Sequence, residues 1–252
     1  MEPIKNDPLP LLARDLPRIE FLPEPADDAL PFGEGQAYLP LKTAKPLVID
    51  LVADFGSYSE RLAPRQQSLD ASRIVAVASL LSQIQPDHGC IRVTGLDILR
   101  RHEMLWRVNA EGLDWEAKRE ELLGRSLHTV DINELAARLE SAAYLRKQLE
   151  RLWAEPATCE GQPQPAEHVV IFLSHGIFFP QGTKIEPAQV DRSCDCAFYY
   201  VRLEPDFVYL FDRIPKILKP IAPRIITSSS PKEFRKDLAD LLRALGAPSA
   251  AR

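Results

Sequence analysis

The chain has 252 residues, of which 45% are hydrophobic and 27% are charged. These proportions are typical of a globular protein with a substantial apolar core, and they exclude intrinsic disorder for the chain as a whole. The 31 Lys and Arg residues and 36 Asp and Glu residues give a net charge of −5 with no basic block. This balance argues against binding to duplex nucleic acid or to an anionic membrane surface.

The sequence also predicts no membrane insertion and no export signal. Its longest apolar runs, such as residues 168–179, are shorter than the roughly 20 residues that cross a bilayer. The N-terminus opens with Glu2, Pro3 and Asp7 instead of a basic and then apolar leader. A cytoplasmic location is therefore the default expectation.

Proline dominates the first 46 residues, which hold nine of the 22 prolines and keep no helical or strand period. We predict an extended arm over residues 1–46, laid across the surface of the domain. The first strand follows in "PLVIDLVADFGSYS", a nearly continuous apolar run that ends in the polar loop 56–59. Such a run is typical of a strand buried on both faces in a parallel sheet.

Helices and strands alternate from there. Asp70 is a candidate N-cap for a helix whose apolar positions continue to Ile84, before Pro86 and Gly89. A strand in "CIRVTGLD", a shorter strand at 105–108 and a helical segment at 115–123 come next. A long amphipathic helix is then predicted over residues 131–154.

The C-terminal third repeats the alternation. "HVVIFLSHG" and "CAFYYVRL" are predicted strands, "FDRIPKILK" is a short helix, "RIIT" is a strand, and a helix runs from Pro231 to Gly246. Together these elements predict an α/β domain over residues 47–247, with a doubly wound, mostly parallel sheet and helices on both faces, followed by a tail at 248–252. Trp106, Trp115 and Trp153 are expected to pack helices onto the sheet.

In such a sheet, ligands bind outside the carboxyl ends of the strands, where each apolar run turns polar. The candidate residues are Asp54, Gly56, Ser57 and Ser59 after the first strand, His128, Thr129 and Asp131 before the long helix, and Ser174, His175 and Gly176 after the central strand.

This layout resembles the von Willebrand factor A (vWA) domain. In that family the first strand ends in Asp-x-Ser-x-Ser, a later loop supplies a Thr, and the central strand ends in Asp followed by Gly. The resemblance covers roughly residues 39–245 and is strongest in "YLPLKTAKPLVIDLVADFGSYS" and in the tail from "CDCAFYYVRL" onward, which is similar to acidobacterial vWA-related proteins. The fold that it implies is a three-layer, Rossmann-like vWA domain.

The resemblance implies a metal-ion-dependent adhesion site for Mg²⁺ or Mn²⁺, here carried by Asp54, Ser57 and Thr129. The pattern is degenerate, because Gly56 and Tyr58 occupy the two serine positions.

The central-strand Asp is also missing, since Ser174 or His175 stands in its place. Imidazole is a poor ligand for a hard ion. We therefore expect weak or no Mg²⁺ binding and no other cofactor. A Zn²⁺ site of His175 and Asp54 would have only two of the three or four protein ligands that zinc uses.

A second resemblance gives the alternative. "VVIFLSHG" resembles the strand of caspase-like cysteine peptidases, in which a His-Gly at the strand end supplies the base, here His175. Cys194 and Cys196 are expected at the opposite edge of the sheet, and no Q-A-C-x-G element occurs. These two cysteines are interpreted as reduced, with a redox pair or half of a metal site as the alternatives.

The other two cysteines, Cys90 and Cys159, have no metal-spaced partner, and four cysteines do not make a disulfide scaffold. The favoured prediction is a non-enzymatic protein-interaction or scaffolding module whose partner is another protein. Related vWA proteins are often exported, which leaves the compartment open. The partner would meet a rim formed by Asp54, Ser57, Ser59, Thr129, Asp131, Ser174 and His175, through hydrogen bonds and shape.

Overall fold

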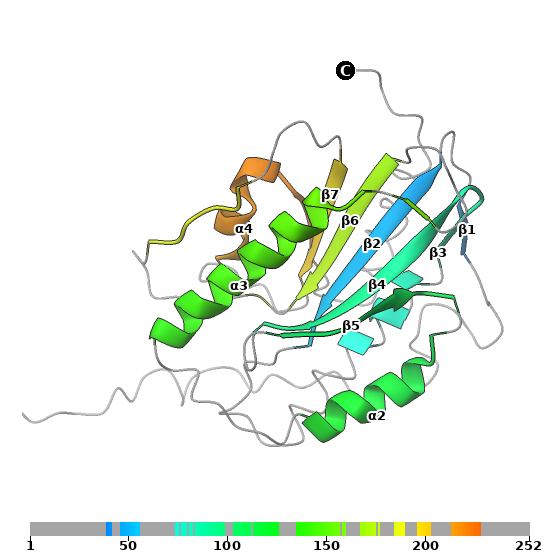
Figure 1. Ribbon diagram of the computed structural model, residues 1–252, viewed down its shortest axis with the longest axis horizontal. Helices are drawn as coiled ribbons and strands as arrows, with labels where there is room; N and C mark the ends of the chain where they lie inside the picture. The colour runs from blue at the N-terminus through cyan, green and yellow to red at the C-terminus, as the bar shows by residue number, and fades with distance from the viewer. Residues whose placement is uncertain are drawn as a thin grey trace, which may run out of the picture.

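A computed structural model of the chain describes residues 39–41, 46–55, 74–75, 77–79, 81–82, 84–98, 103–111, 113–125, 135–156, 158–159, 167–174, 176, 184–189, 196–202 and 213–227. Within these ranges the main feature is a six-stranded sheet with the order β5-β4-β2-β6-β7-β8 (Figure 1). Its strands are β2 (Leu47–Asp54), β4 (Gly89–Asp97), β5 (Glu103–Asn109), β6 (Glu167–Ser174), β7 (Cys196–Arg202) and β8 (Arg224–Thr227).

The sheet is mostly parallel, which confirms the predicted α/β class. Each neighbouring pair runs parallel except β4 and β5, which are antiparallel. The connection between β4 and β5 is residues 98–102, far shorter than the dozen or so residues that a parallel crossover needs. The strand predicted at 105–108 is therefore an antiparallel edge strand.

The two central strands are mostly apolar because both of their faces are covered. All eight residues of β2 are buried, as are seven of the eight residues of β6. Side chains alternate between the faces of a strand. Leu47, Ile49 and Leu51 consequently pack with the helical residues between 74 and 82, whereas Val52 packs with the opposite layer.

Helix α3 (Leu135–Ala154) is the main cover of that opposite layer, and Figure 1 shows it with α4 (Ile214–Ile217) on one face of the sheet. Its buried side chains recur three or four residues apart, as predicted for an amphipathic helix: Ala142, Leu145, Leu149 and Leu152. Residues 131–134 of the predicted helix lie outside the described ranges. No helix in the described part of the chain combines the length and apolar composition of a membrane-spanning segment.

The three tryptophans pack as expected. The rings of Trp106 and Trp115 meet edge-to-face, with centroids 6.1 Å apart. Both pack against the core on the face of the sheet that holds Leu47 and Ile49, and Trp115 is the first residue of α2 (Trp115–Arg125). Trp153 of α3 stacks on Phe198 of β7 at 5.1 Å. These rings therefore join helices to the sheet and to its edge strand β5.

One predicted helix boundary is wrong. Ile84 belongs to β3 (Ile84–Pro86), which pairs in parallel with β1 (Leu39–Leu41), and not to the preceding helix. Helical spacing cannot separate these cases, because Ile84 is buried in the same core as the helical residues before it. The strand β1 lies within the predicted arm. The remainder of that arm apart from Pro46, and the predicted helix 231–246, fall outside the described residues.

Candidate functional site

The polar site predicted at the carboxyl ends of the central strands contains a direct hydrogen bond between two of its predicted members. Asp54 ends β2 and Ser174 ends β6, and both are fully buried. The Ser174 hydroxyl donates to Asp54 Oδ2 at 2.8 Å, and the Ile98 backbone N–H donates to Oδ1 at 3.3 Å. The Gly176 N–H in turn donates to Ser174 Oγ at 3.0 Å. This chain of bonds joins the ends of β2 and β6 to the residue that follows β4.

The position of this bond follows from the strand order. From β2 the chain moves to β4 and β5 on one side, and then crosses to β6, β7 and β8 on the other. The reversal of direction lies between β2 and β6, and such a switch point is where open α/β sheets bind ligands. Asp54 and Ser174 lie at that switch point.

Three acidic side chains lie near this edge of the sheet. The pKa of Tyr144, on α3, is raised to about 12 by burial and by the negative charges of Glu103, Asp97 and Asp54. Asp97 ends β4 and pairs in register with Glu103, the first residue of β5. Arg202, which ends β7 and pairs in register with Ser174, adds a guanidinium to the three carboxylates at this edge.

Of the predicted rim, the structure brings together Asp54 and Ser174. The other predicted members lie outside the described residues: Ser57, Ser59, Thr129, Asp131 and His175. Two of the three predicted metal ligands, Ser57 and Thr129, therefore also lie outside the described residues. Within the described ranges, no group of three or more His, Cys, Asp or Glu side chains is arranged to hold a metal ion. Each oxygen of the Asp54 carboxyl already accepts a hydrogen bond.

Sequence analysis missed Asp97, although the same reasoning applies to it. Asp97 is the last residue of "CIRVTGLD", where an apolar strand turns polar, and it is buried. The signal that placed Asp54 on the rim was thus present here as well.

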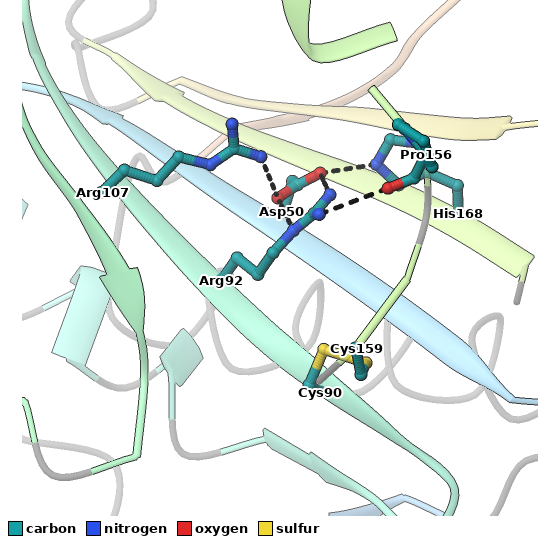
Figure 2. Close-up of a disulfide and its surroundings, with 7 residues drawn as sticks. All are labelled: Asp50, Cys90, Arg92, Arg107, Pro156, Cys159 and His168. Atoms are coloured by element: carbon teal, nitrogen blue, oxygen red, sulfur yellow. Dashed lines mark hydrogen bonds and ion pairs between the residues drawn. A yellow bond between two sulfur atoms is a disulfide. The ribbon is translucent and has the colours of Figure 1, made fainter. Parts of the chain in front are cut away.

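A second polar cluster, not predicted from the sequence, lies in the amino half of the sheet on the same face (Figure 2). Its centre is Asp50 of β2, which is fully buried. Arg92 of β4 donates to Asp50 Oδ1 from Nε at 2.7 Å and to Oδ2 from Nη2 at 2.5 Å. His168 Nε2 lies 2.6 Å from Oδ2, and Arg107 Nη2 of β5 lies 3.7 Å from Oδ1.

Cations and hydrogen bonds keep Asp50 ionised despite its burial. Burial alone would raise its pKa, but hydrogen bonds from His168 and Arg92 and the charge of Arg92 bring the pKa below its ordinary value. An ionised carboxylate only accepts hydrogen bonds. The Nε2–H group of His168 is therefore the donor of the hydrogen bond to Asp50 Oδ2.

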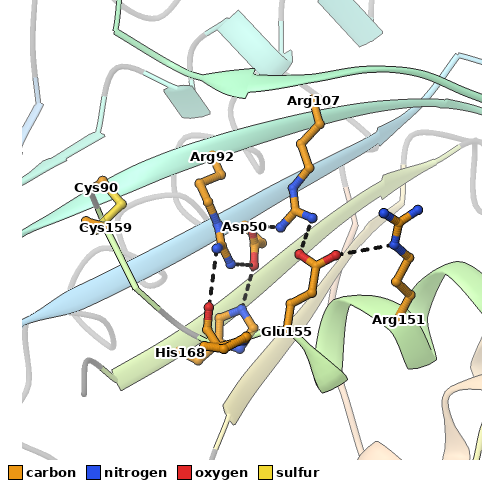
Figure 3. Close-up of polar contacts among 9 residues, drawn as sticks. Asp50, Cys90, Arg92, Arg107, Arg151, Glu155, Cys159 and His168 are labelled. Carbon is orange, nitrogen blue, oxygen red and sulfur yellow. Dashed lines mark hydrogen bonds and ion pairs between the residues drawn. A yellow bond between two sulfur atoms is a disulfide. The ribbon is translucent and has the colours of Figure 1, made fainter. Parts of the chain in front are cut away.

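The C-terminal end of α3 extends this cluster (Figure 3). Glu155 pairs with Arg107, and its other carboxylate oxygen lies 3.3 Å from Arg151 Nε. The next residue contributes its carbonyl oxygen, because Arg92 Nη1 donates to Pro156 at 3.4 Å. Strands β2, β4, β5 and β6 are thereby connected to the end of α3.

A disulfide fastens the same segment to the sheet. Cys90 of β4 is bonded to Cys159, 69 residues later (Figure 2). Sequence analysis gave neither cysteine a partner, because spacing along the chain does not report which strand lies beside the end of α3. Cys90 precedes Arg92 by two residues, so both side chains project from the same face of β4.

The signal for the second cluster was weak but present. Asp50 and Arg92 each interrupt an otherwise apolar run, and His168 stands at the start of a third. A buried charge requires a partner. The sequence alone did not show which of these residues pair, because that depends on strand order and register.

The strand register also places Cys196. It pairs with His168 at the amino end of β6, six residues before Ser174 at the other end of that strand. The alternative peptidase pair would join this cysteine to His175, which lies outside the described residues. Cys194 lies outside the described residues.

Comparisons with known proteins complete the description. No protein-family model matches the chain. No curated protein matches it. Its structure is similar to that of the pilus adhesin SpaC from Lactobacillus rhamnosus GG, with a TM-score of 0.39 and 9% sequence identity over 82% of this chain. The chain spans 32% of the length of SpaC, and no role is assigned from this similarity.

Proposed function

We propose that this chain is a non-catalytic protein-binding module of the vWA type, which binds its partner at the carboxyl-end rim of the sheet. The observation that carries the proposal is the buried Asp54–Ser174 hydrogen bond at the switch point between β2 and β6. Around it, the proposed rim includes Ser57, Ser59, Thr129, Asp131 and His175.

The hydrogen bonds at Ser174 support a binding role over a catalytic one. The hydroxyl donates its proton to Asp54, and its oxygen accepts the Gly176 N–H. The hydroxyl therefore serves as both donor and acceptor in bonds that hold the ends of the strands in place. A rigid base of this kind suits a surface formed by the loops above it.

The excess of carboxylates over the one guanidinium of Arg202 at this edge indicates what the partner presents. Asp97 and Glu103 are close enough to Tyr144 to raise its pKa together with Asp54. Electrostatic complementarity then favours a partner with Lys or Arg side chains and hydrogen-bond donors over one that offers a carboxylate. With the degenerate ligand set, Mg²⁺ or Mn²⁺ contributes little to this recognition.

Site-specific crosslinking tests the proposed surface. A photoreactive amino acid at Thr129 should crosslink to a partner protein, and the Asp54→Asn substitution should reduce that crosslink. The control position is Lys219, an exposed residue that precedes the amino end of β8 and so lies at the opposite edge of the sheet. Equal crosslinking from both positions, or a crosslink unaffected by Asp54→Asn in folded protein, would contradict the proposal.

A thermal-unfolding titration separates metal-free from metal-dependent recognition. A bound ion at a hundredfold excess over its dissociation constant stabilises a protein by about 2.7 kcal/mol. We expect Mg²⁺ and Mn²⁺ to leave the unfolding midpoint at its value in EDTA. A rise in the midpoint that Asp54→Asn abolishes would instead establish a working adhesion site.

A further inference from the structure

A cavity of about 530 Å³ lies beside the charged cluster, between β4, β5 and the segment after α3. This volume falls within the range of small-molecule sites, roughly 300–1,000 Å³. The cavity is lined by Arg92, Arg107, Asn109, Glu155, Thr158 and Cys159, together with Val108. It belongs to the amino half of the sheet and is separate from the carboxyl-end rim.

Both arginines retain hydrogen-bond donors for this cavity. A guanidinium has five N–H groups. The Arg92 side chain donates three of them, two to Asp50 and one to Pro156 O, which leaves two. Arg107 directs Nη1 toward Glu155 and Nη2 toward Asp50, so its Nε–H and one N–H on each Nη remain. The two side chains are 15% and 22% exposed, so the remaining N–H groups are partly shielded from water.

Two neutral side chains add donors to the same wall. Asn109 ends β5 and Thr158 follows α3, and both line the cavity. Neither side chain has a hydrogen-bond partner among the described residues. The carboxamide N–H groups of Asn109 and the hydroxyl of Thr158 can therefore bind a ligand without breaking a hydrogen bond to the described residues.

The unused guanidinium N–H groups favour an anion. The charges of Arg92 and Arg107 are balanced by Asp50 and Glu155, and Arg151, which pairs with Glu155 outside the cavity, adds one further positive charge. Partly buried guanidiniums bind oxyanions strongly, because the bonds are charge-assisted and can be bidentate.

We propose that this cavity is a binding site for a phosphate group, free or carried by a small molecule. A tetrahedral phosphate offers three or four acceptor oxygens, and donors from Arg92, Arg107, Asn109 and Thr158 surround the cavity. A planar carboxylate has two oxygens and satisfies fewer of these donors. The cavity volume exceeds that of one phosphate, and Val108 and the disulfide offer apolar surface to the remainder of a ligand.

Calorimetric titration with inorganic phosphate, at an ionic strength held constant with NaCl, tests the site. The wild-type protein should bind phosphate saturably. Asn109→Asp should weaken binding about tenfold or more by placing a carboxylate in the cavity, and Arg107→Gln should weaken it similarly by removing charge-assisted bonds. The control is Arg146→Gln, which removes the same charge from an arginine of α3 that pairs with Glu186 outside the cavity; its affinity should stay within about twofold.

Asn109→Asp keeps the test decisive if Arg107→Gln destabilises the fold, because it preserves side-chain size and breaks no contact among the described residues.

Ribose 5-phosphate and ribose distinguish the sources of the phosphate. Tighter binding of ribose 5-phosphate than of phosphate supports a phosphorylated small molecule, and the reverse order supports the free anion. Absence of saturable binding, equal affinity in wild type and Asn109→Asp, or acetate binding as tight as phosphate would overturn the site.

Discussion

Asp54 and Asp50 lie four residues apart on the same face of β2, and both are fully buried, but they are stabilised differently. Among the described residues, Asp54 accepts hydrogen bonds from a serine hydroxyl and a backbone N–H, and the carboxylates of Asp97 and Glu103 lie at the same edge. Asp50 accepts an arginine fork and a histidine N–H, with a second arginine nearby. One strand face thus has mostly carboxylates near its carboxyl end and a carboxylate compensated by arginines in its amino half. The two regions suit different ligands for this reason.

The largest effect that would test this contrast is expected at Asp50. Asp50→Asn removes the charge that compensates Arg92 in a buried site and weakens the hydrogen bond with His168. Breaking such a pair from one side costs about 3–5 kcal/mol of unfolding free energy. Chemical denaturation should show this loss.

Asp114→Asn provides the control for Asp50, because it makes the same chemical change at an exposed position. Asp114 accepts the Ala117 N–H at the start of α2, and Asn caps helices about as well as Asp. Its unfolding free energy should change by less than about 0.5 kcal/mol. A loss of under about 1 kcal/mol for Asp50→Asn would show that Asp50 is not the centre of the cluster.

The next largest effect concerns the disulfide that holds the end of α3 against the cluster. Its sequence separation is 69 residues, and disulfides of this kind typically stabilise by about 2–4 kcal/mol. Replacing both Cys90 and Cys159 with Ser should lower the unfolding free energy by that amount. Reductant should destabilise the wild type and leave the double variant unchanged. Equal responses of the two proteins to reductant would contradict the pairing.

The Cys90–Cys159 disulfide also allows a test of the cellular compartment in which the protein folds. Disulfides persist in oxidising compartments and are rare in the cytosol. Alkylation of the protein in intact cells should leave Cys90 and Cys159 unmodified if it folds in an oxidising compartment. Modification of both would favour the cytoplasmic location expected from the sequence.

A smaller loss is expected at the carboxyl end. Ser174→Ala removes one donor to Asp54 and the acceptor of the Gly176 N–H, which leaves buried polar groups without partners at a cost of about 1–3 kcal/mol. Ser82 lies on the other face, where its half-buried hydroxyl donates to Ser79 O and accepts the Trp115 Nε1–H; Ser82→Ala should cost about 0.5–1.5 kcal/mol. Thermal and chemical unfolding compare the two. If Ser174→Ala costs no more than Ser82→Ala, the bond between the strand ends contributes little.

The smallest and most diagnostic effect is the pH dependence of stability. Because the folded-state pKa of Asp50 is lowered, its contribution is fully present above its unfolded pKa of about 4 and is lost as the pH falls through the folded pKa. One carboxyl changes stability by at most about 1.4 kcal/mol per pH unit. Below about pH 4 the wild type should lose stability more steeply than Asp50→Asn. Parallel curves for the two proteins would show that the pKa of Asp50 is not lowered.

The elements of the fold were largely predictable, because their signals are local. The apolar runs of β2 and β6 and the helical spacing of Leu145, Leu149 and Leu152 each lie within a few turns or one strand. Asp54 and Ser174 were predicted for the same reason, as the last residues of such runs. Ile84 was assigned wrongly because its burial fits a helix and a short strand equally well.

The amino-half cluster depended on contacts that no local pattern contains. Arg92 lies 42 residues from Asp50, His168 lies 118 residues from it, and Cys159 lies 69 residues from Cys90. The sequence by itself determined which segments are strands and helices and which strand ends are polar, because backbone periodicity and burial act over short stretches. Only the tertiary structure decided which charges meet, because pairing follows from the order and register of strands that are distant along the chain.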